Sequence, residues 1–324
     1  MEFKTRIALV FAGQGAQHIG MAKELFDAYP SVRALFELAS DVSKKDMRKL
    51  LFSSDEATLR ETINTQPAVT LASISSLVAL RLMGLREENI AWVAGFSLGE
   101  YAALVAADVL TIEEIFSLVN ERGRIMHQAG EEFKKNMGDP GMAAVIGLNS
   151  GQIRAILNDQ DEVFIANYNA PEQVVISGLL RQIDRLEPLL KDAGARRVMK
   201  LSVSGPFHTP LLSNASLEFK AVVTGLRFAS PKIPLYSNVS GGLMTSGAEI
   251  QAKMSEQISH PVLWQKIISD ATERFSERVA VEIGPGNVLS GLMRANHADY
   301  TMFPSMKLDD MKRLVEHITQ PTVS

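Results

Sequence analysis

Apolar and polar residues follow one another in a pattern that predicts strands and helices in turn, from residue 6 to about residue 120. Short apolar runs at 6–13 and 89–97 predict buried strands. The segments between them predict one or two helices over 21–40 and a long apolar helix over 66–84. We place Pro67 at the first position of that helix, where its missing N–H costs nothing. Strands that alternate with helices indicate a parallel sheet covered on both faces.

A different pattern begins near residue 130, after the charged and turn-rich segment EEFKKNMGDPG. Strand and helix signals then follow in the order β-α-β-β-α, with a further strand over 195–203. This order is typical of a small ferredoxin-like module. We therefore expect an inserted ferredoxin-like subdomain at 133–203.

Composition narrows the possible functions and location. The chain has 324 residues, a net charge of −4 and no basic cluster interleaved with aromatic residues, which argues against nucleic acid as a partner. It has no cysteine, which excludes a thiol nucleophile, a cysteine-ligated metal site and disulfide bonds. The N-terminal apolar run fits a first strand better than a signal peptide, and no stretch approaches the length of a transmembrane helix. We expect a soluble cytoplasmic protein without a membrane partner.

The segment VAGFSLGEYAAL (93–104) places Ser97 between Gly95 and Gly99, where a predicted strand meets a predicted Ala-rich helix. This G-x-S-x-G arrangement is that of a nucleophile elbow. The helix N-terminus then directs its N–H groups at the serine, where negative charge develops during acyl transfer. The motif alone also fits a serine that only caps a helix, so both interpretations stay open at this point.

A serine nucleophile needs a base, and His208 is the best placed of the histidines. Pro206 and Pro210 restrict the backbone on both sides of it, and a base must stay within hydrogen-bond reach of the hydroxyl. A loop histidine held by packing is the alternative interpretation. The elbow and the strand–helix alternation together predict an α/β-hydrolase-like parallel-sheet core, formed by residues 1–132 and 204–324.

Seven motifs occur in this order along the chain: FAGQGAQ (11–17), TQPAV (65–69), GFSLGEYAAL (95–104), ERGRIM (121–126), ANYNAPEQVVISG (166–178), PFHTPLL (206–212) and EIGPGNVLSGL (282–292). Together they resemble the malonyl-CoA:acyl carrier protein transacylases of fatty acid and polyketide synthesis. The resemblance extends from about residue 6 to about residue 293. Seven ordered matches are far more specific than any one of them.

The resemblance implies a reaction and its principal residues. A malonyl group would pass from malonyl-CoA to the phosphopantetheine thiol of acyl carrier protein through a malonyl-serine, with ping-pong kinetics. No metal or redox cofactor is implied, because the CoA thioester is itself a substrate. Ser97 would be the nucleophile, His208 the general base and acid. The backbone N–H groups of Leu98 and Gln14 would form the oxyanion hole.

Three further residues match positions that the family uses around the substrate. Arg122 matches the arginine that binds the malonyl carboxylate through two parallel hydrogen bonds, whereas Arg124 would face elsewhere on a helix. Gln257 matches a residue whose backbone carbonyl orients the catalytic histidine, and no Asp or Glu is an evident third triad member. Asn167 is expected near the contact between the inserted module and the pocket.

Two phenylalanines bear on acyl selectivity. In related acyltransferases of polyketide synthesis, a phenylalanine just before the catalytic histidine accompanies malonyl and a serine accompanies methylmalonyl. Phe207 would therefore fill the space that an α-methyl branch needs, or else it anchors its loop in the core. Phe96 departs from the family, which usually has histidine immediately before the nucleophile, and this leaves the contacts near the acyl carboxylate open.

The main alternative is an acyl hydrolase or an editing thioesterase on the same fold. An α/β-hydrolase would place its base late in the chain, where only His297 and His317 occur, without supporting motifs. An editing hydrolase would be expected to lack the carboxylate-binding Arg122. A non-catalytic docking subunit would not need the serine and the histidine together. The family is commonly monomeric, so we expect a monomer.

Overall fold

The computed structural model describes residues 5–157 and 162–319, and a six-stranded sheet lies at its centre, in the order β10-β9-β1-β2-β7-β8. Its strands from β10 to β7 run parallel, and β8 pairs antiparallel with β7 at one edge. The bounds are β1 (Ile7–Phe11), β2 (Ile90–Gly95), β7 (Leu235–Tyr236), β8 (Leu243–Met244), β9 (Val279–Ile283) and β10 (Thr301–Pro304).

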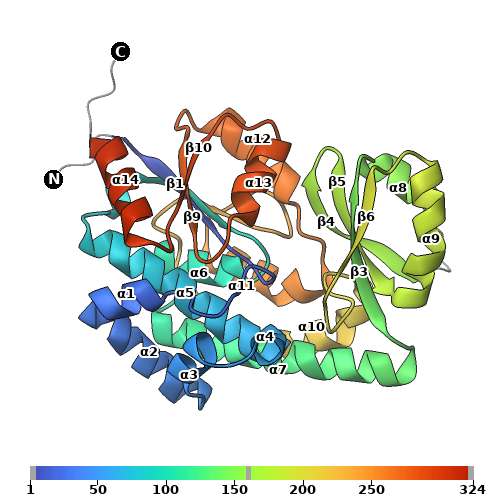
Figure 1. Cartoon of the computed structure of the whole chain (residues 1–324), viewed down its shortest axis with the longest axis horizontal. Helices are drawn as coiled ribbons and strands as arrows, with labels where there is room; N and C mark the ends of the chain where they lie inside the picture. Colours follow the sequence, from blue (N-terminus) through green and yellow to red (C-terminus); the bar gives the residue numbers. More distant parts are fainter. Residues whose placement is uncertain (1–4, 158–161, 320–324) are drawn as a thin grey trace.

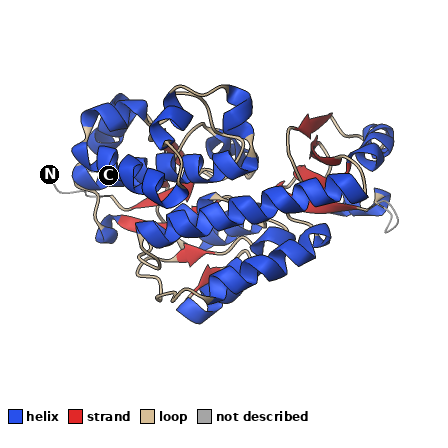
Figure 2. Cartoon of the chain, turned by 90° about the horizontal axis from the view of Figure 1, so that it is seen from below, coloured by secondary structure: helices blue, strands red, loops and turns tan. Residues whose placement is uncertain are grey.

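Both faces of this sheet are buried. Along β1, Ile7, Leu9 and Phe11 contribute to one apolar cluster, while Ala8 and Val10 contribute to another on the opposite face. Figures 1 and 2 show helices on both sides of the strands. The predicted α/β fold with a parallel-sheet core is therefore confirmed.

The helices that cover the large sheet, or that connect it to the rest of the chain, come from both halves of the sequence. They are α1 (Lys23–Ala28), α2 (Pro30–Ser43), α3 (Met47–Phe52), α4 (Glu56–Arg60), α5 (Thr62–Leu82), α6 (Gly99–Ala106), α7 (Ile112–Asn136), α10 (Ser213–Thr224), α11 (Gly247–Glu256), α12 (Trp264–Arg274), α13 (Val288–Ala295) and α14 (Leu308–Thr319).

The prediction for Pro67 is wrong, because α5 begins at Thr62 and the proline lies inside the helix. Proline has no N–H to donate to the carbonyl four residues earlier, here that of Ile63. The ammonium group of Lys45 replaces this donor: its Nζ lies 2.8 Å from the Ile63 oxygen and 2.7 Å from the Asn64 side-chain oxygen. A side chain from outside the helix thus satisfies the free carbonyl and allows the proline.

The expectation that no stretch approaches transmembrane length is also wrong for α5. This helix has 21 residues and is long and apolar enough to cross a membrane by those two criteria alone. However, 83% of its apolar window is buried inside the fold. The apolar character of α5 is therefore explained by its place in the core.

A second sheet contains four antiparallel strands in the order β4-β5-β3-β6 and lies beside the large one, at the right of Figure 1. Its strands and helices follow one another as β-α-β-β-α-β. They are β3 (Pro140–Ile146), α8 (Ser150–Ile156), β4 (Val163–Ala170), β5 (Gln173–Leu179), α9 (Leu180–Asp192) and β6 (Arg197–Leu201). The helix α7 continues past residue 132, so the expected domain boundary falls within its last turn.

The two faces of the small sheet have different neighbours. One face forms its own apolar cluster, which includes Val145, Ile165 and Ile176, with side chains of α8 and α9. On the other face, Met142 and Ala144 belong to the main core. The small sheet is therefore packed against the large domain through an apolar face.

The role of Lys45 gives a stability prediction. Lys45→Met keeps most of the apolar stem but leaves the Ile63 carbonyl without its donor, so we expect a loss of about 1–3 kcal/mol in the free energy of unfolding. Pro67→Ala supplies a helical N–H for the same carbonyl. Lys45→Met should therefore cost less in the Pro67→Ala background, as measured by chemical denaturation. Equal losses in both backgrounds would contradict this role.

Candidate active site

Ser97 lies in a tight turn between β2 and α6, with a φ of 50° in the left-handed region. A Cβ on Gly99 would overlap the backbone carbonyl of Phe11 at the end of β1, and one on Gly95 would overlap the backbone of the turn itself. Both glycines are therefore required by close backbone contacts. The turn presents Ser97 at the carboxyl ends of the parallel strands, where α/β sheets bind their ligands.

A buried asparagine fixes this turn, and the sequence analysis did not find it. The Oδ1 atom of Asn238 accepts a hydrogen bond from the Ser97 N–H at 2.6 Å, and its Nδ2 donates to the Gly95 carbonyl at 2.6 Å. Asn238 follows β7, which pairs with β2. Only this pairing of distant strands brings it to the elbow, so no local sequence signal was available.

His208 is hydrogen-bonded to the serine. Its Nε2 lies 2.7 Å from the Ser97 Oγ, and its Nδ1 lies 3.1 Å from the main-chain oxygens of both Gln257 and His260. Carbonyl oxygens only accept, so Nδ1 carries the proton and Nε2 is free to accept the hydroxyl proton. The Gln257 carbonyl thus has the position that the resemblance implies, and the His260 carbonyl is an acceptor that the sequence analysis missed.

The electrostatic surroundings keep this histidine neutral. Burial, followed by the positive charge of Arg122, lowers the pKa of His208 to about 4, although its bonds to the two carbonyls act in the opposite direction. A neutral imidazole is the form that can accept a proton at neutral pH. The pair therefore has the geometry and the protonation state of a nucleophile and its general base.

Arg122 projects inward from α7 and is only 1% exposed. Its two terminal nitrogens donate to the side-chain oxygens of Gln66 at 2.9 Å and Gln257 at 3.1 Å. Within the described residues its Nε has no hydrogen-bond partner. Arg124 points to the surface, where it pairs with Glu121 and Glu218. Helical periodicity allowed only one of the two arginines to point inward, and the family resemblance selected Arg122.

The expected oxyanion donors lie at the same edge of the sheet. Leu98 immediately precedes α6, and Gln14 lies in the loop after β1, where the neighbouring Gly13 comes close to the Phe96 carbonyl. Over residues 5–157 and 162–319, neither the Leu98 nor the Gln14 backbone N–H donates to a protein atom. Both are available for an oxyanion, and their role stays a prediction.

Three predicted residues lie near the site without a hydrogen bond to Ser97 or His208. Asn167 on β4 forms an isolated β-bridge with Val262. Val262 lies two residues after His260, whose carbonyl contacts His208. Phe207 is 5% exposed and belongs to the main core. The ring of Phe96 packs edge-on against Trp264, with 5.5 Å between centroids. Their effects on the substrate remain predictions.

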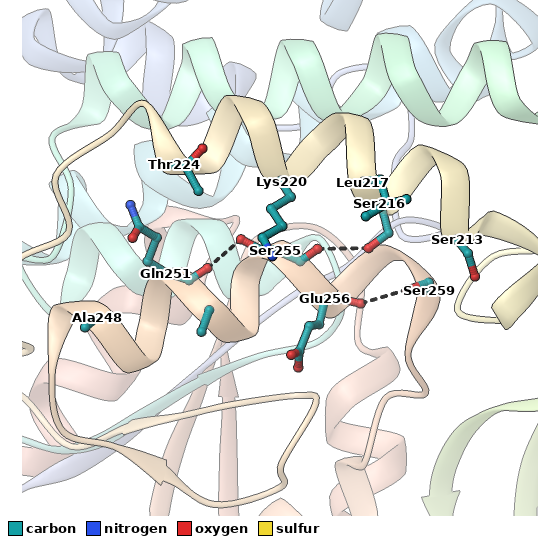
Figure 3. Close-up of a pocket in the computed structure, with 11 residues that line it drawn as sticks. Ser213, Ser216, Leu217, Lys220, Thr224, Ala248, Gln251, Ser255, Glu256 and Ser259 are labelled. Atoms are coloured by element: carbon teal, nitrogen blue, oxygen red, sulfur yellow. Dashed lines mark hydrogen bonds between the residues drawn. The ribbon is translucent and has the colours of Figure 1, made fainter.

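Two hollows open on the surface near this site. One of 470 Å³ lies between α10 and α11 and is shown in Figure 3; it contains neither Ser97 nor His208. The other, of 640 Å³, lies between the small sheet and the loop after α11, and His260 lines it. In the described part of the chain, no group of three or more His, Asp or Glu residues is arranged to hold a metal ion.

A family model, described as the acyl transferase domain, matches residues 8–321. The chain belongs to this acyl transferase family. It is 36% identical over 298 residues to the malonyl CoA-acyl carrier protein transacylase of Bacillus subtilis, with 90% of each chain covered. It is 35% identical over 316 residues to the protein of that name from Staphylococcus aureus, covering 95% of this chain and 98% of that one.

Solved structures agree with this acyl transferase assignment. The malonyl-CoA:acyl carrier protein transacylase of Xanthomonas oryzae superposes with a TM-score of 0.90 at 32% identity, covering 98% of this chain and 100% of that one. A malonyl-transacylase in complex with its type II PKS acyl carrier protein gives a TM-score of 0.90 at 32% identity, covering 97% and 100%. The whole acyl transferase fold is thus shared with these proteins.

The low pKa of His208 predicts a pH-dependent stability. In the unfolded chain the imidazole titrates near 6.5. The contribution of the neutral His208 to the free energy of unfolding is therefore complete above that pH and is lost as the pH falls through 4. The total is about 3 kcal/mol. The difference in unfolding free energy between wild type and His208→Asn should change by this amount between neutral pH and pH 4.

Glu100 has the opposite effect on the pH dependence of stability. Burial raises its pKa to about 7, so its contribution to the free energy of unfolding falls as the pH rises. Its contribution is present in both proteins and cancels from that difference. The same substitution at the exposed His297 is the matched control. A difference that does not depend on pH would mean that His208 is not held neutral by the fold.

Proposed function

We propose that this acyltransferase moves a malonyl group from malonyl-CoA to the phosphopantetheine thiol of acyl carrier protein through a malonyl-serine at Ser97. The hydrogen bond of 2.7 Å between the Ser97 Oγ and the His208 Nε2, beside a buried arginine, carries the proposal. The relatives' names, and the acyl carrier protein in one similar structure, support the choice of substrates.

In the first half-reaction His208 removes the hydroxyl proton while the Ser97 Oγ attacks the thioester carbonyl of malonyl-CoA. The backbone N–H groups of Leu98 and Gln14 stabilise the resulting oxyanion. The C–S bond then breaks, and the imidazolium protonates the departing CoA thiolate. In the second half-reaction His208 deprotonates the carrier-protein thiol, and the thiolate attacks the acyl-serine carbonyl. The bond between the acyl carbon and Oγ breaks, and the imidazolium returns the proton to the Ser97 Oγ. Because one thioester replaces another, no metal or redox cofactor is needed.

Arg122 binds the malonyl carboxylate in this proposal. A buried carboxylate needs a charged partner, and the unpartnered Nε, together with one terminal nitrogen, offers two parallel donors. Phe207 excludes an α-methyl branch, and Asn167 lies where the small sheet meets the pocket. The presence of Arg122 favours transfer of a carboxylated acyl group over the alternative, an acyl hydrolase or editing thioesterase.

We extend the proposal to the organisation of the molecule. Residues 1–132 and 204–324 form an α/β-hydrolase-like catalytic core, and residues 133–203 form a ferredoxin-like subdomain that covers one side of the site. The protein acts as a cytoplasmic monomer that meets acyl carrier protein in solution.

Intact-mass measurement tests the acyl-enzyme. Brief exposure of the wild type to malonyl-CoA should add one malonyl group, and Ser97→Ala should add none, because it lacks the hydroxyl that His208 activates. His208→Ala should slow the addition by several orders of magnitude, since His208 both removes the hydroxyl proton and protonates the departing CoA thiolate in this half-reaction. The exposed His297→Ala variant should react at the wild-type rate. Normal malonylation of Ser97→Ala would disprove the assignment of the nucleophile.

Arg122→Ala distinguishes substrate binding from a structural role. Without the guanidinium the malonyl carboxylate is buried unpaired, so malonyl transfer should lose on the order of 3–5 kcal/mol of transition-state stabilisation. Acetyl-CoA has no carboxylate, so its slow reaction should lose much less, only what the contact of Arg122 with Gln257 contributes to alignment. The measured quantity is the ratio of malonyl to acetyl transfer, with surface Arg124→Ala as the control. A parallel loss of both activities would show that Arg122 maintains the fold only.

A further inference from the structure

A fully buried carboxylate lies behind the catalytic pair and takes no part in the steps above. Glu100 is on α6, three residues after Ser97, and is 1% exposed. Its Oε1 accepts from the Asn238 N–H at 3.1 Å, and its Oε2 accepts from the Gln257 Nε2 at 2.5 Å. Burying an ionised carboxylate costs free energy unless donors compensate, and these two contacts favour the charged form.

The two ends of the Gln257 side-chain amide have different partners. Its Oε1 faces Arg122, which can only donate, and its Nε2 faces Glu100, which when ionised can only accept. The Nε2 also donates to the Ser97 carbonyl at 3.0 Å. Only one orientation of the amide satisfies all three contacts. Arg122, the Ser97 carbonyl and Glu100 therefore all require the same orientation, and the ionised Glu100 holds the Nε2 end in place.

Gln257 connects this amide to the catalytic base, because its own main-chain oxygen accepts the His208 Nδ1–H. Asn238 makes a second connection, because its backbone N–H binds Glu100 while its side chain holds the Ser97 N–H. One carboxylate thus holds the two residues that contact the nucleophile, the base and Arg122.

We propose that Glu100 is a positioning residue for acyl transfer, and that its ionised carboxylate orients Gln257 and Asn238 so that Ser97, His208 and Arg122 are aligned. The role rests on the proposed function. A protonated or amide side chain at position 100 would present a donor to the Gln257 Nε2 or to the Asn238 N–H, which also donate, so one of the two contacts that hold these residues would be lost.

The surroundings of Glu100 make this role sensitive to pH. The charged and titratable groups around it are Arg122 from α7 and Tyr101 from its own helix, and His208 shares Gln257 with it. Burial raises the pKa of Glu100 to about 7, against the hydrogen bonds from Gln257 and Asn238 and the charge of Arg122. Because the pKa of His208 is lowered to about 4, the two groups should titrate far apart.

The test is the pH dependence of malonyl-Ser97 formation at limiting malonyl-CoA, followed by rapid quench and intact mass. The wild-type rate should rise with a midpoint near the Glu100 pKa. Glu100→Gln should be slower by about tenfold above neutral pH and should lack that midpoint, leaving only the fall towards the titration of His208. Thermal unfolding is recorded for each variant.

Glu282→Gln is the matched control, because Glu282 is also fully buried and accepts from the backbone of Leu289 and Ser290 at the start of α13. It should keep the wild-type midpoint even where its melting temperature falls. If Glu100→Gln does not fold, Gln257→Leu removes the amide but keeps the main-chain carbonyl, and it should also lose the midpoint.

The role of Glu100 is overturned if Glu100→Gln has the same midpoint and the same rate as the wild type. It is also overturned if the midpoint persists in Gln257→Leu. Loss of the midpoint in Glu282→Gln also overturns it, since any buried glutamate would then have the same effect. A wild type that forms no malonyl-Ser97 contradicts the proposed function, and this role with it. If the wild type forms malonyl-Ser97 and Glu100→Gln forms it with the same rate and pH dependence, only the role of Glu100 is contradicted.

Discussion

The left-handed turn at Ser97 is the constraint on which the rest of the site depends. The turn exists because the end of β1 leaves no room for a side chain at Gly99, and because Asn238 holds the Ser97 N–H and the Gly95 carbonyl. Strand order supplies both conditions, since β2 lies between β1 and β7. The same order brings the loop of Gln14 to the elbow. A parallel sheet thus assembles the acyltransferase site from segments that are distant in sequence.

A polar network in the interior maintains this arrangement. Arg122 and Glu100 carry opposite charges, are both 1% exposed, and are linked through the amide of Gln257. Such a network is costly when it is incomplete, because each member leaves a buried partner unsatisfied when removed. The cost favours one arrangement of α6, α7 and the segment after α11 over any alternative. The alignment of Ser97 therefore depends on a buried network that extends well beyond the reacting serine and histidine.

Local patterns predicted much of this molecule, and long-range contacts explain what they missed. Period and spacing found the strands and the elbow at Ser97, and they showed that only one of Arg122 and Arg124 can point inward. Gln257 was found only through the family resemblance, since its main-chain oxygen has no signature in the sequence. Asn238 and Glu100 look like ordinary polar residues until the fold surrounds them. Pro67 was misplaced because the donor that allows it, Lys45, lies outside the helix.

The backbone at Ser97 also limits which nucleophiles this scaffold can evolve. Serine and threonine carry the same hydroxyl, but a φ of 50° is a conformation in which a β-branched side chain is a steric outlier. Threonine would have to relax the turn, and the turn cannot relax without separating from the end of β1. The backbone conformation therefore favours serine over threonine as the nucleophile, although the two side chains carry the same reactive group. The reacting oxygen at this position is therefore confined to an unbranched side chain, whatever acyl group is bound.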